Sequence, residues 1–285
     1  MDRFSNLPKD LISEILSRTS PRDVCRSSVI SRRFNSVANS DDMWGKFLPP
    51  DISKMVYQGV FTTTKELYFC LANSFVLLDN RALSLALNKA SGERSFMLGT
   101  RELAIECRSY PVNWTCLSWL HSRFSEVADL ERVPWFDITG KIEARLLSPQ
   151  TTYVVYFVFR LRSRLCTLGL IPPKAKASIR FFDGERRDGG GDGDRHGHGN
   201  EITNIVSLGV QPSHSDGQFA RYREDDEWME IELGEFFNGQ GDTSEIEMRL
   251  TAVEGGHWSY DIFVEGIELR PKVIKILNKS VRLFR

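Results

Sequence analysis

The feature that most constrains the fold is a change in hydrophobic periodicity near residue 94. In the first fifty residues, apolar side chains recur with the spacing of one helix face, as in segment 11–16. Beyond a turn signal at 91–94, apolar and polar residues alternate with the period of a strand, as in segments 103–108 and 135–146. The chain is therefore predicted to hold a small helical unit followed by a larger β-rich unit.

Residues 1–50 are predicted to form three short helices. The first begins at Leu7 and Pro8, because proline is tolerated in the first turn of a helix. The second begins at Ser20, a capping residue, with Pro21 at the first helical position. Three short helices bury little surface, so this unit is expected to pack against a neighbour or a partner.

Residues 51–94 are predicted to form a helical connector, with helices over 65–72 and 80–89. Residues 95–272 are predicted to form an antiparallel, jelly-roll-like β-sandwich, because many short strands, frequent turn signals and few helices are typical of that architecture. The predicted strands are 103–108, 135–146, 151–160, 178–182, 228–233, 245–253 and 260–269. The fold class is thus α+β and multidomain.

Two further segments differ in composition. Segment 188–200 has six glycines and no apolar side chain, so it is predicted to be a disordered loop. Its candidate metal ligands are Asp192, Asp194, His196 and His198. Thr203 stands where a calcium loop needs glutamate, so we predict a solvated loop without a resident metal, with opportunistic transition-metal binding as the alternative. Segment 273–285 is a basic tail, either an amphipathic helix for anionic partners or a cap on the sandwich.

Charge and composition argue against several function classes. The chain has 37 basic and 38 acidic residues, so no chain-wide attraction to nucleic acid or to anionic membranes is expected. The longest apolar run, 153–159, is far shorter than the roughly 20 residues of a membrane span. Five scattered cysteines without a Cys-x-x-Cys pair argue against a disulfide framework and a zinc ribbon. Since the N-terminus has no apolar signal core either, we expect a soluble, reduced, intracellular protein.

No motif for catalysis stands out. Neither Gly-x-Ser-x-Gly nor a cysteine-protease signature occurs. Acids are frequent between 224 and 235, but no pair among them is singled out for glycoside hydrolysis. Trp114 and Trp119 lie in a turn-rich stretch, where tryptophan serves either as a lid on the core or as a platform for a sugar or peptide. We therefore predict no catalytic residues and no cofactor.

Residues 4–50 resemble an F-box. The matching positions are Leu7, Pro8, Ile12, Ile15, Leu16, Ser20–Val24, Val29–Phe34 and Trp44. Phe34 stands where many F-boxes carry tryptophan, and Ser31 where many carry cysteine. The resemblance implies that apolar side chains bind a Skp-type adaptor, which is itself bound to a cullin. The predicted adaptor-binding residues are Leu7, Pro8, Ile12, Ile15, Leu16, Phe34 and Trp44.

Residues 95–272 resemble phloem protein 2, the Nictaba-like lectin domain of plants. The matching segments are 96–105, 113–114, 122–124, 133–142, 226–236, 256–258 and 266–272. The resemblance implies binding of N-glycans or oligosaccharides that contain N-acetylglucosamine or mannose. The candidate carbohydrate-binding residues are Trp114, Trp119, Glu230 and Glu235. Cys107 and Cys116 replace aromatic residues of the family's sugar-binding members, so we expect weak glycan binding, with protein recognition as the competing use of this surface.

The two resemblances together are similar to the plant F-box/phloem protein 2 group. They imply a non-catalytic substrate receptor of a Skp–cullin–F-box ubiquitin ligase, in the cytoplasm and nucleus, that recruits target proteins, glycosylated ones included. No nucleic acid and no membrane span are expected. The first alternative is a lectin without a ligase role, and the second is a glycosidase.

Overall fold

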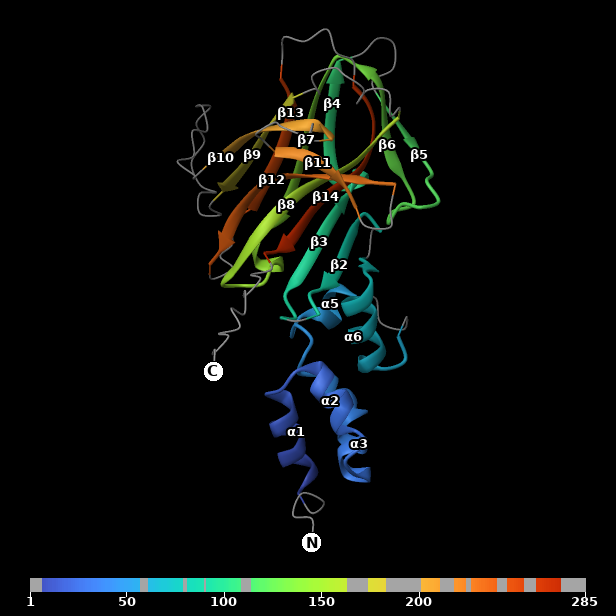
Figure 1. Ribbon diagram of the computed structural model, residues 1–285, viewed down its shortest axis with the longest axis vertical. Coiled ribbons are helices and arrows are strands. Elements are labelled where there is room, and N and C mark those ends of the chain that lie inside the picture. The colour runs from blue at the N-terminus through green and yellow to red at the C-terminus, as the bar shows by residue number, and fades with distance from the viewer. Residues whose placement is uncertain are drawn as a thin grey trace, which may run out of the picture.

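The computed structural model describes residues 7–56, 61–78, 81–89, 91–108, 114–162, 174–182, 201–210, 218–223, 227–239, 245–253 and 260–272. The chain has a helical end and a β-rich end, which form the lower and upper parts of Figure 1. The helices are α1 (Lys9–Ser17), α2 (Pro21–Ser27), α3 (Arg32–Ala38), α4 (Asp41–Gly45), α5 (Ile52–Met55) and α6 (Thr64–Asn73).

Side-chain caps fix where three of these helices begin. Ser20, Ser31 and Thr63 each accept a hydrogen bond from the backbone N–H three residues later. Each cap satisfies a donor that the first helical turn leaves unpaired. The prediction that Ser20 and Pro21 begin a helix is confirmed.

Trp44 lies at the centre of the helical end. Its side chain is fully buried, and its indole Nε1 donates to the carbonyl oxygen of Ala38 at 2.8 Å. The ring centroids of Tyr68 and Phe69, both on α6, each lie 5.1 Å from that of Trp44. Because α6 also packs against the first strands, one apolar core runs from the helices into the sheets.

The β-rich end consists of two sheets that face each other across this core. Sheet A holds, in spatial order, β1 (Val76–Leu77), β2 (Leu83–Leu87), β3 (Arg94–Gly99), β14 (Tyr260–Pro271), β8 (Thr151–Leu161), β12 (Met229–Asn238) and β11 (Gln218–Tyr222). Beside it, β6 (Val127–Val133) pairs with β14, and β5 (Thr115–Leu117) pairs with β6. Sheet B holds β10 (Ile202–Val210), β9 (Lys174–Phe182), β13 (Glu245–Ala252), β7 (Trp135–Glu143) and β4 (Leu103–Arg108). Among the described strands, β10 and β11 pair in parallel and join the sheets, and the other pairs are antiparallel.

The two faces of sheet A differ in what they bury. On β8, Tyr153, Val155, Phe157 and Phe159 belong to the main core. The alternating residue Val158 belongs to a second, smaller apolar cluster on the outer face of the sheet. The members of this outer cluster are Met97, Phe124, Val127, Val158, Trp228 and Phe263, with Leu77 and Trp119 packed against it.

Most predicted elements are confirmed, with two errors. The first fifty residues hold the four helices α1 to α4, whereas three were predicted. The predicted helix over 65–72 corresponds to α6, and each of the seven predicted strands overlaps an observed strand. The predicted helix over 80–89 is wrong, because residues 83–87 form β2, which pairs with β3. Three leucines alternate there with serine and alanine, a period of two that fits a strand. The predicted loop 188–200 and tail 273–285 lie outside the described residues.

Gly266 lies where β14 comes close to the backbone of β3 in sheet A. It follows an irregularity in the pairing of β14 with β8. A Cβ atom at this position would lie 2.0 Å from the carbonyl oxygen of Leu98 on β3. Since the obstacle is backbone, only movement of a strand can make room for a side chain.

We expect Gly266→Ala to lower the free energy of unfolding by about 2 kcal/mol or more, because overpacking against backbone forces the strands apart. Gly45→Ala is the matched control, since a Cβ at Gly45 meets nothing within 4 Å. The measurement is urea unfolding of the full chain. Equal midpoints for the two variants would show that β3 and β14 are not held at this distance.

Candidate functional site

The predicted adaptor-binding residues fall into a buried and an exposed set. Ile12 and Trp44 are 0% exposed, Leu16 is 3% and Phe34 is 6%. These four side chains form the core of helices α1–α4, so a partner cannot reach them unless that core opens. The structure thus corrects their part of the prediction, because it places these side chains in the helical core and not on the surface.

The exposed set contains residues that the sequence reasoning missed. Ile15 is 51% exposed and Pro8 is exposed, whereas Leu7 is half-buried. Three further large apolar side chains are exposed on α1 and in the turn between α2 and α3, namely Leu11 at 52%, Val29 at 87% and Ile30 at 54%. We name the exposed set of Pro8, Leu11, Ile15, Val29 and Ile30 the apolar patch. The signal in the sequence was the apolar stripe of 11–16, which is wider than the face that α1 buries.

The candidate carbohydrate-binding tryptophans lie in different apolar clusters. Trp114 is half-buried and packs against the main core. Trp119 is half-buried on the outer face of sheet A, with its ring centroid 5.0 Å from that of Phe263 and 6.3 Å from that of Trp228. The guanidinium of Arg160 lies 4.8 Å from the Trp119 ring centroid, a cation–π distance. Trp119 is therefore the tryptophan that shares a face with both candidate glutamates.

The two candidate glutamates have different environments. Glu230 is only 4% exposed, and its oxygens are ion-paired with Arg270 and with Arg221, the latter at 2.7 Å. Glu235 is about half exposed and pairs with Lys272 on the same outer face. Glu230 therefore orients arginines, whereas Glu235 is accessible to a ligand.

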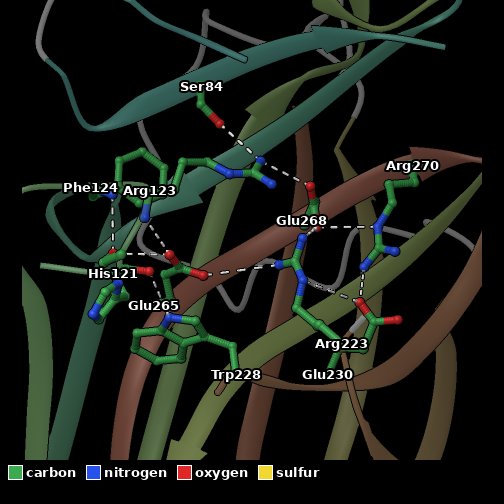
Figure 2. Close-up of polar contacts among 11 residues, drawn as sticks. Ser84, His121, Arg123, Phe124, Arg223, Trp228, Glu230, Glu265, Glu268 and Arg270 are labelled. Carbon is green, nitrogen blue, oxygen red and sulfur yellow. Dashed lines mark hydrogen bonds and ion pairs between the residues drawn. The ribbon is translucent and has the colours of Figure 1, made fainter. Parts of the chain in front are cut away.

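Glu230 belongs to a set of buried charges that the sequence reasoning did not foresee, which we name the charge cluster. Its members are Arg123, Arg223, Arg270, Glu230, Glu265 and Glu268. Figure 2 shows Glu268 between Arg123, Arg223 and Arg270. One Glu268 oxygen lies 2.9 Å from Arg123, and the other lies 3.3 Å from Arg223 and 3.2 Å from Arg270. A buried carboxylate is retained in this way only when opposite charges surround it.

Glu265 holds a loop across the outer face. Its Oε1 accepts a hydrogen bond from Ser122 Oγ at 2.9 Å and one from the backbone N–H of Arg123 at 2.7 Å. Next to these contacts, Trp228 Nε1 donates to the carbonyl oxygen of His121 at 3.3 Å, as Figure 2 shows. Phe124 closes the loop by packing over Gly99. The segment that carries Trp119 is therefore anchored close to the tryptophan.

Burial and charge shift the pKa values in this cluster in opposite directions. Burial alone would raise the pKa of Glu268, but the positive charges of Arg123, Arg270 and Arg223 hold it below its ordinary value. Likewise, burial would raise the pKa of Glu230, and Arg270 and Arg221 lower it overall. For Glu265, burial prevails and raises the pKa. Glu230 and Glu268 are therefore the charged partners of the arginines at neutral pH.

These contacts suit positioning rather than proton transfer. Each carboxylate of the charge cluster faces arginine, a group that does not give up its proton in proteins. Within the described ranges, no three histidine, cysteine, aspartate or glutamate side chains converge on a possible metal position. In the same part of the chain, every helix is too short or too polar to cross a membrane.

Comparison with known families agrees with both halves of this structure. The family model for phloem protein 2 matches residues 93–271, and the model for the F-box domain matches residues 4–46. The chain belongs to the F-box proteins that carry a phloem protein 2 domain. Proteins with an F-box are typically non-catalytic components of their assemblies.

Curated relatives share this two-part organisation along nearly the whole chain. F-box protein At2g02240 of Arabidopsis thaliana is 39% identical over 269 residues, which cover 94% of this chain and 80% of that protein. Putative F-box protein PP2-B2 of the same plant is 35% identical, with 94% of this chain and 83% of that protein covered. F-box protein PP2-B10 is 36% identical, with 95% of each chain covered. Among solved structures, a family 22 carbohydrate-binding module of Clostridium thermocellum Xyn10B aligns with 60% of this chain and 87% of its own at 10% identity and a TM-score of 0.33.

Two variants of the charge cluster are expected to behave differently. Glu268→Gln leaves three arginines without their central carboxylate, so we expect a loss of about 3 kcal/mol in the free energy of unfolding at pH 7. Glu265→Gln keeps an oxygen acceptor for Ser122 and Arg123 while it removes a charge that burial disfavours, so stability at pH 7 should be kept or should rise.

The pH dependence provides the check. Because the pKa of Glu268 is lowered in the folded state, its contribution is present at neutral pH and is lost as the pH falls below the ordinary glutamate value of about 4.3. The difference in the free energy of unfolding between wild type and Glu268→Gln should therefore shrink as the pH falls. Unfolding curves from pH 7 to pH 3 measure this difference. A difference that widens as the pH falls would contradict the lowered pKa assigned to Glu268.

Proposed function

We propose that this protein is the substrate-receptor subunit of a Skp–cullin–F-box ubiquitin ligase. The F-box would bind the adaptor, and the phloem protein 2 domain would hold the protein to be modified. The apolar patch on the helical end is the observation that carries this proposal. The ubiquitin-transfer chemistry would take place on other subunits, which is consistent with a charge cluster that positions a surface instead of moving protons.

The apolar patch has the properties of a protein-binding surface. Val29, at 87% exposure, and its neighbours present large apolar side chains that a monomer of this size has no reason to leave in water. The buried Ile12 and Leu16 fix the helix that presents Leu11 and Ile15. Such a patch, held by a packed core, can supply the central anchors of an interface.

Basic side chains are frequent beside Val29 and Ile30, whereas the acids Asp10 and Glu14 are exposed beside Leu11 and Ile15 on α1. The exposed arginines near Val29 and Ile30 are Arg22, Arg26, Arg32 and Arg33. One aspartate, Asp23, lies among them and is 3.9 Å from Arg26. A partner surface that combines apolar pockets with acidic groups would therefore complement the part of the patch around Val29 and Ile30 and bind it faster at low salt.

The two ends of the molecule are joined in a way that suits a receptor. Arg94 on β3 binds Asp51 near α5 through two contacts of 2.5 and 3.1 Å, and it donates to the carbonyl oxygen of Leu146. The Arg94 side chain is only 10% exposed, so this ion pair is weakly screened by solvent. A target held by the β-rich end would thus keep a defined distance from the adaptor-bound end.

The outer face of sheet A is the proposed target-binding surface. Trp119 rests on Phe263 and Arg160, and Tyr156 lies beneath Arg270, whose guanidinium is 4.0 Å from the ring centroid. Arg160 and Tyr156 are four residues apart on β8, or about 13 Å at 3.3 Å per residue. A ligand that contacts both must therefore be extended, and among extended ligands we propose the glycan of a glycosylated target.

The adaptor proposal predicts a separation of binding from stability. Ile15→Asp should weaken adaptor binding at least tenfold and leave the melting temperature close to wild type, because the side chain is exposed. Ile12→Ala should instead cost about 2 to 4 kcal/mol of stability, because it empties a buried site. Calorimetry with a Skp-type adaptor and thermal melts of both variants test this.

Ile205→Asp is the matched control, since Ile205 is 54% exposed on sheet B, away from the helical end. If Ile15→Asp and Ile205→Asp bind the adaptor with equal affinity, the proposed interface is refuted. The combined change of Leu7 and Pro8 to alanine extends the test to the start of α1.

The glycan proposal predicts weak, saturable binding of chitotriose or a high-mannose glycan, in the high-micromolar to millimolar range, since a shallow surface has little apolar area to offset the ordering of a sugar. Trp119→Ala should abolish it. Trp114→Ala should mainly lower the melting temperature, because Trp114 packs against the main core. Cys107 lies on β4 in sheet B and packs against the main core, so Cys107→Trp should leave binding at this face unchanged. If Trp114→Ala loses glycan binding and Trp119→Ala keeps it, the glycan site does not lie on this face. If neither wild type nor any variant binds a glycan, peptide recognition is favoured.

A further inference from the structure

A cavity of about 570 Å³ lies between the helical end and the phloem protein 2 domain. One wall comes from the turn after α1, from α4 and the residues that follow it, and from Tyr68 on α6. The opposite wall comes from the turn between β2 and β3 and from Ser148. A volume of this size falls within the range of small-molecule sites in proteins. No part of the proposed ligase function uses it.

The lining of this cavity is positively charged. Its charged residues are Arg18, Lys46, Lys89 and Arg94, and no carboxylate lines it. Arg94 is neutralised by Asp51. Arg18 and Lys46 share one acid, Glu14, at 2.9 and 3.8 Å, and the structure records no ion pair for the exposed Lys89 among the described residues. Glu93 lies behind the β wall, where its carboxylate accepts a hydrogen bond from Ser91 Oγ at 2.6 Å. The charged side chains that line the cavity itself are positive on both walls, and an anion between them would interact favourably with both.

Two hydroxyl groups add hydrogen-bonding capacity. Tyr68 is only 4% exposed and lines the cavity, and in the described part of the chain no hydrogen bond is recorded for its hydroxyl. Its ring is fixed by contacts with Trp44, Phe47 and Phe69. Burial raises the pKa of Tyr68, so the hydroxyl stays a neutral donor. The hydroxyl is not enclosed by protein atoms, so it can donate to a ligand in the cavity.

Ser148 completes the donor set from the other wall. Its Oγ accepts a hydrogen bond from the backbone N–H of Arg94 at 3.0 Å, and its O–H can turn from the neighbouring Tyr153 hydroxyl toward an anion. The carbonyl groups at the end of α1 do not oppose an anion strongly, because they are already engaged. The backbone and hydroxyl of Thr19 both donate to the carbonyl oxygen of Leu16, and Ser17 Oγ donates to that of Glu14.

We propose that this cavity binds a small organic compound with at least two phosphate groups. Phosphate offers several acceptor oxygens and more than one negative charge, which match cations and hydroxyl donors on two facing walls better than a single carboxylate does. Lys46 and Lys89 hold the phosphates from opposite sides, and Tyr68 and Ser148 donate to them. The bound compound bridges the F-box and the phloem protein 2 domain.

Calorimetry of the full chain with pyrophosphate and with ADP tests the proposal. Both probes should bind with one-to-one stoichiometry, and both should raise the melting temperature, since a ligand of the folded state stabilises it. Lys46→Gln and Lys89→Gln should each weaken binding by about tenfold, and Tyr68→Phe should weaken it several-fold while it keeps the ring contacts. Lys176→Gln is the matched control, because Lys176 is exposed on β9, outside this cavity, and should leave binding unchanged.

Three results would overturn the proposal. One is the absence of saturable binding by wild type at millimolar concentrations of either probe. Another is equal weakening in Lys176→Gln and Lys89→Gln, which would mean general attraction of anions to a basic surface. The last is binding of a doubly phosphorylated peptide without binding of pyrophosphate or ADP. Lys89 is exposed, so Lys89→Gln is expected to fold, and adaptor binding measured on the same samples keeps this result separate from the ligase proposal.

Discussion

Strand β14 is the element on which both faces of sheet A depend. It pairs with β3 and β6 along one edge and with β8 along the other. Ile267 and Leu269 enter the main core, whereas Glu268 and Arg270 enter the charge cluster on the opposite face. Gly266 lets the strand come close enough to β3 for this arrangement. The alternation of one strand thus sets the packing of the sandwich and the electrostatics of its outer face together.

The helical end needs the β-rich end to bury part of its apolar surface. The apolar surface that stays exposed can serve as an interface. Short helices α1 to α4 cannot bury all their apolar side chains alone. Trp44 packs against α6, and α6 packs against β2, so the apolar core extends from the helices to the sheet. The apolar side chains that remain exposed, such as Val29, are those that face away from this shared core. Packing against the connector therefore fixes which residues are left for a partner.

Sequence reasoning succeeded where the signal was local. The capped start at Ser20 and the apolar run 153–159 each reflect one element, and both are found as predicted. It failed where contacts with residues distant in the sequence determine the environment of a residue. Strand β6 was missed because a cluster on each face buries it, so its sequence does not alternate. Glu230 was expected to meet a sugar, but its partner is Arg270, forty residues further along the chain, and no local pattern reveals that pair. Likewise, only the packing of α1 distinguishes the buried Ile12 from the exposed Ile15.

The charge cluster can preorganise the proposed target-binding surface without a deep pocket. Buried ion pairs contribute little net stability, since desolvation offsets most of their attraction, but they fix geometry strongly. Here Glu265 fixes the loop that carries Trp119, and Arg270 is fixed over Tyr156 by its carboxylate partners. Aromatic rings that are already immobilised lose little entropy when a ligand stacks on them, which matters most for a weakly binding sugar. The arginines and glutamates therefore act on recognition through the rigidity of their neighbours, and a change within the cluster should alter binding even where it touches no ligand.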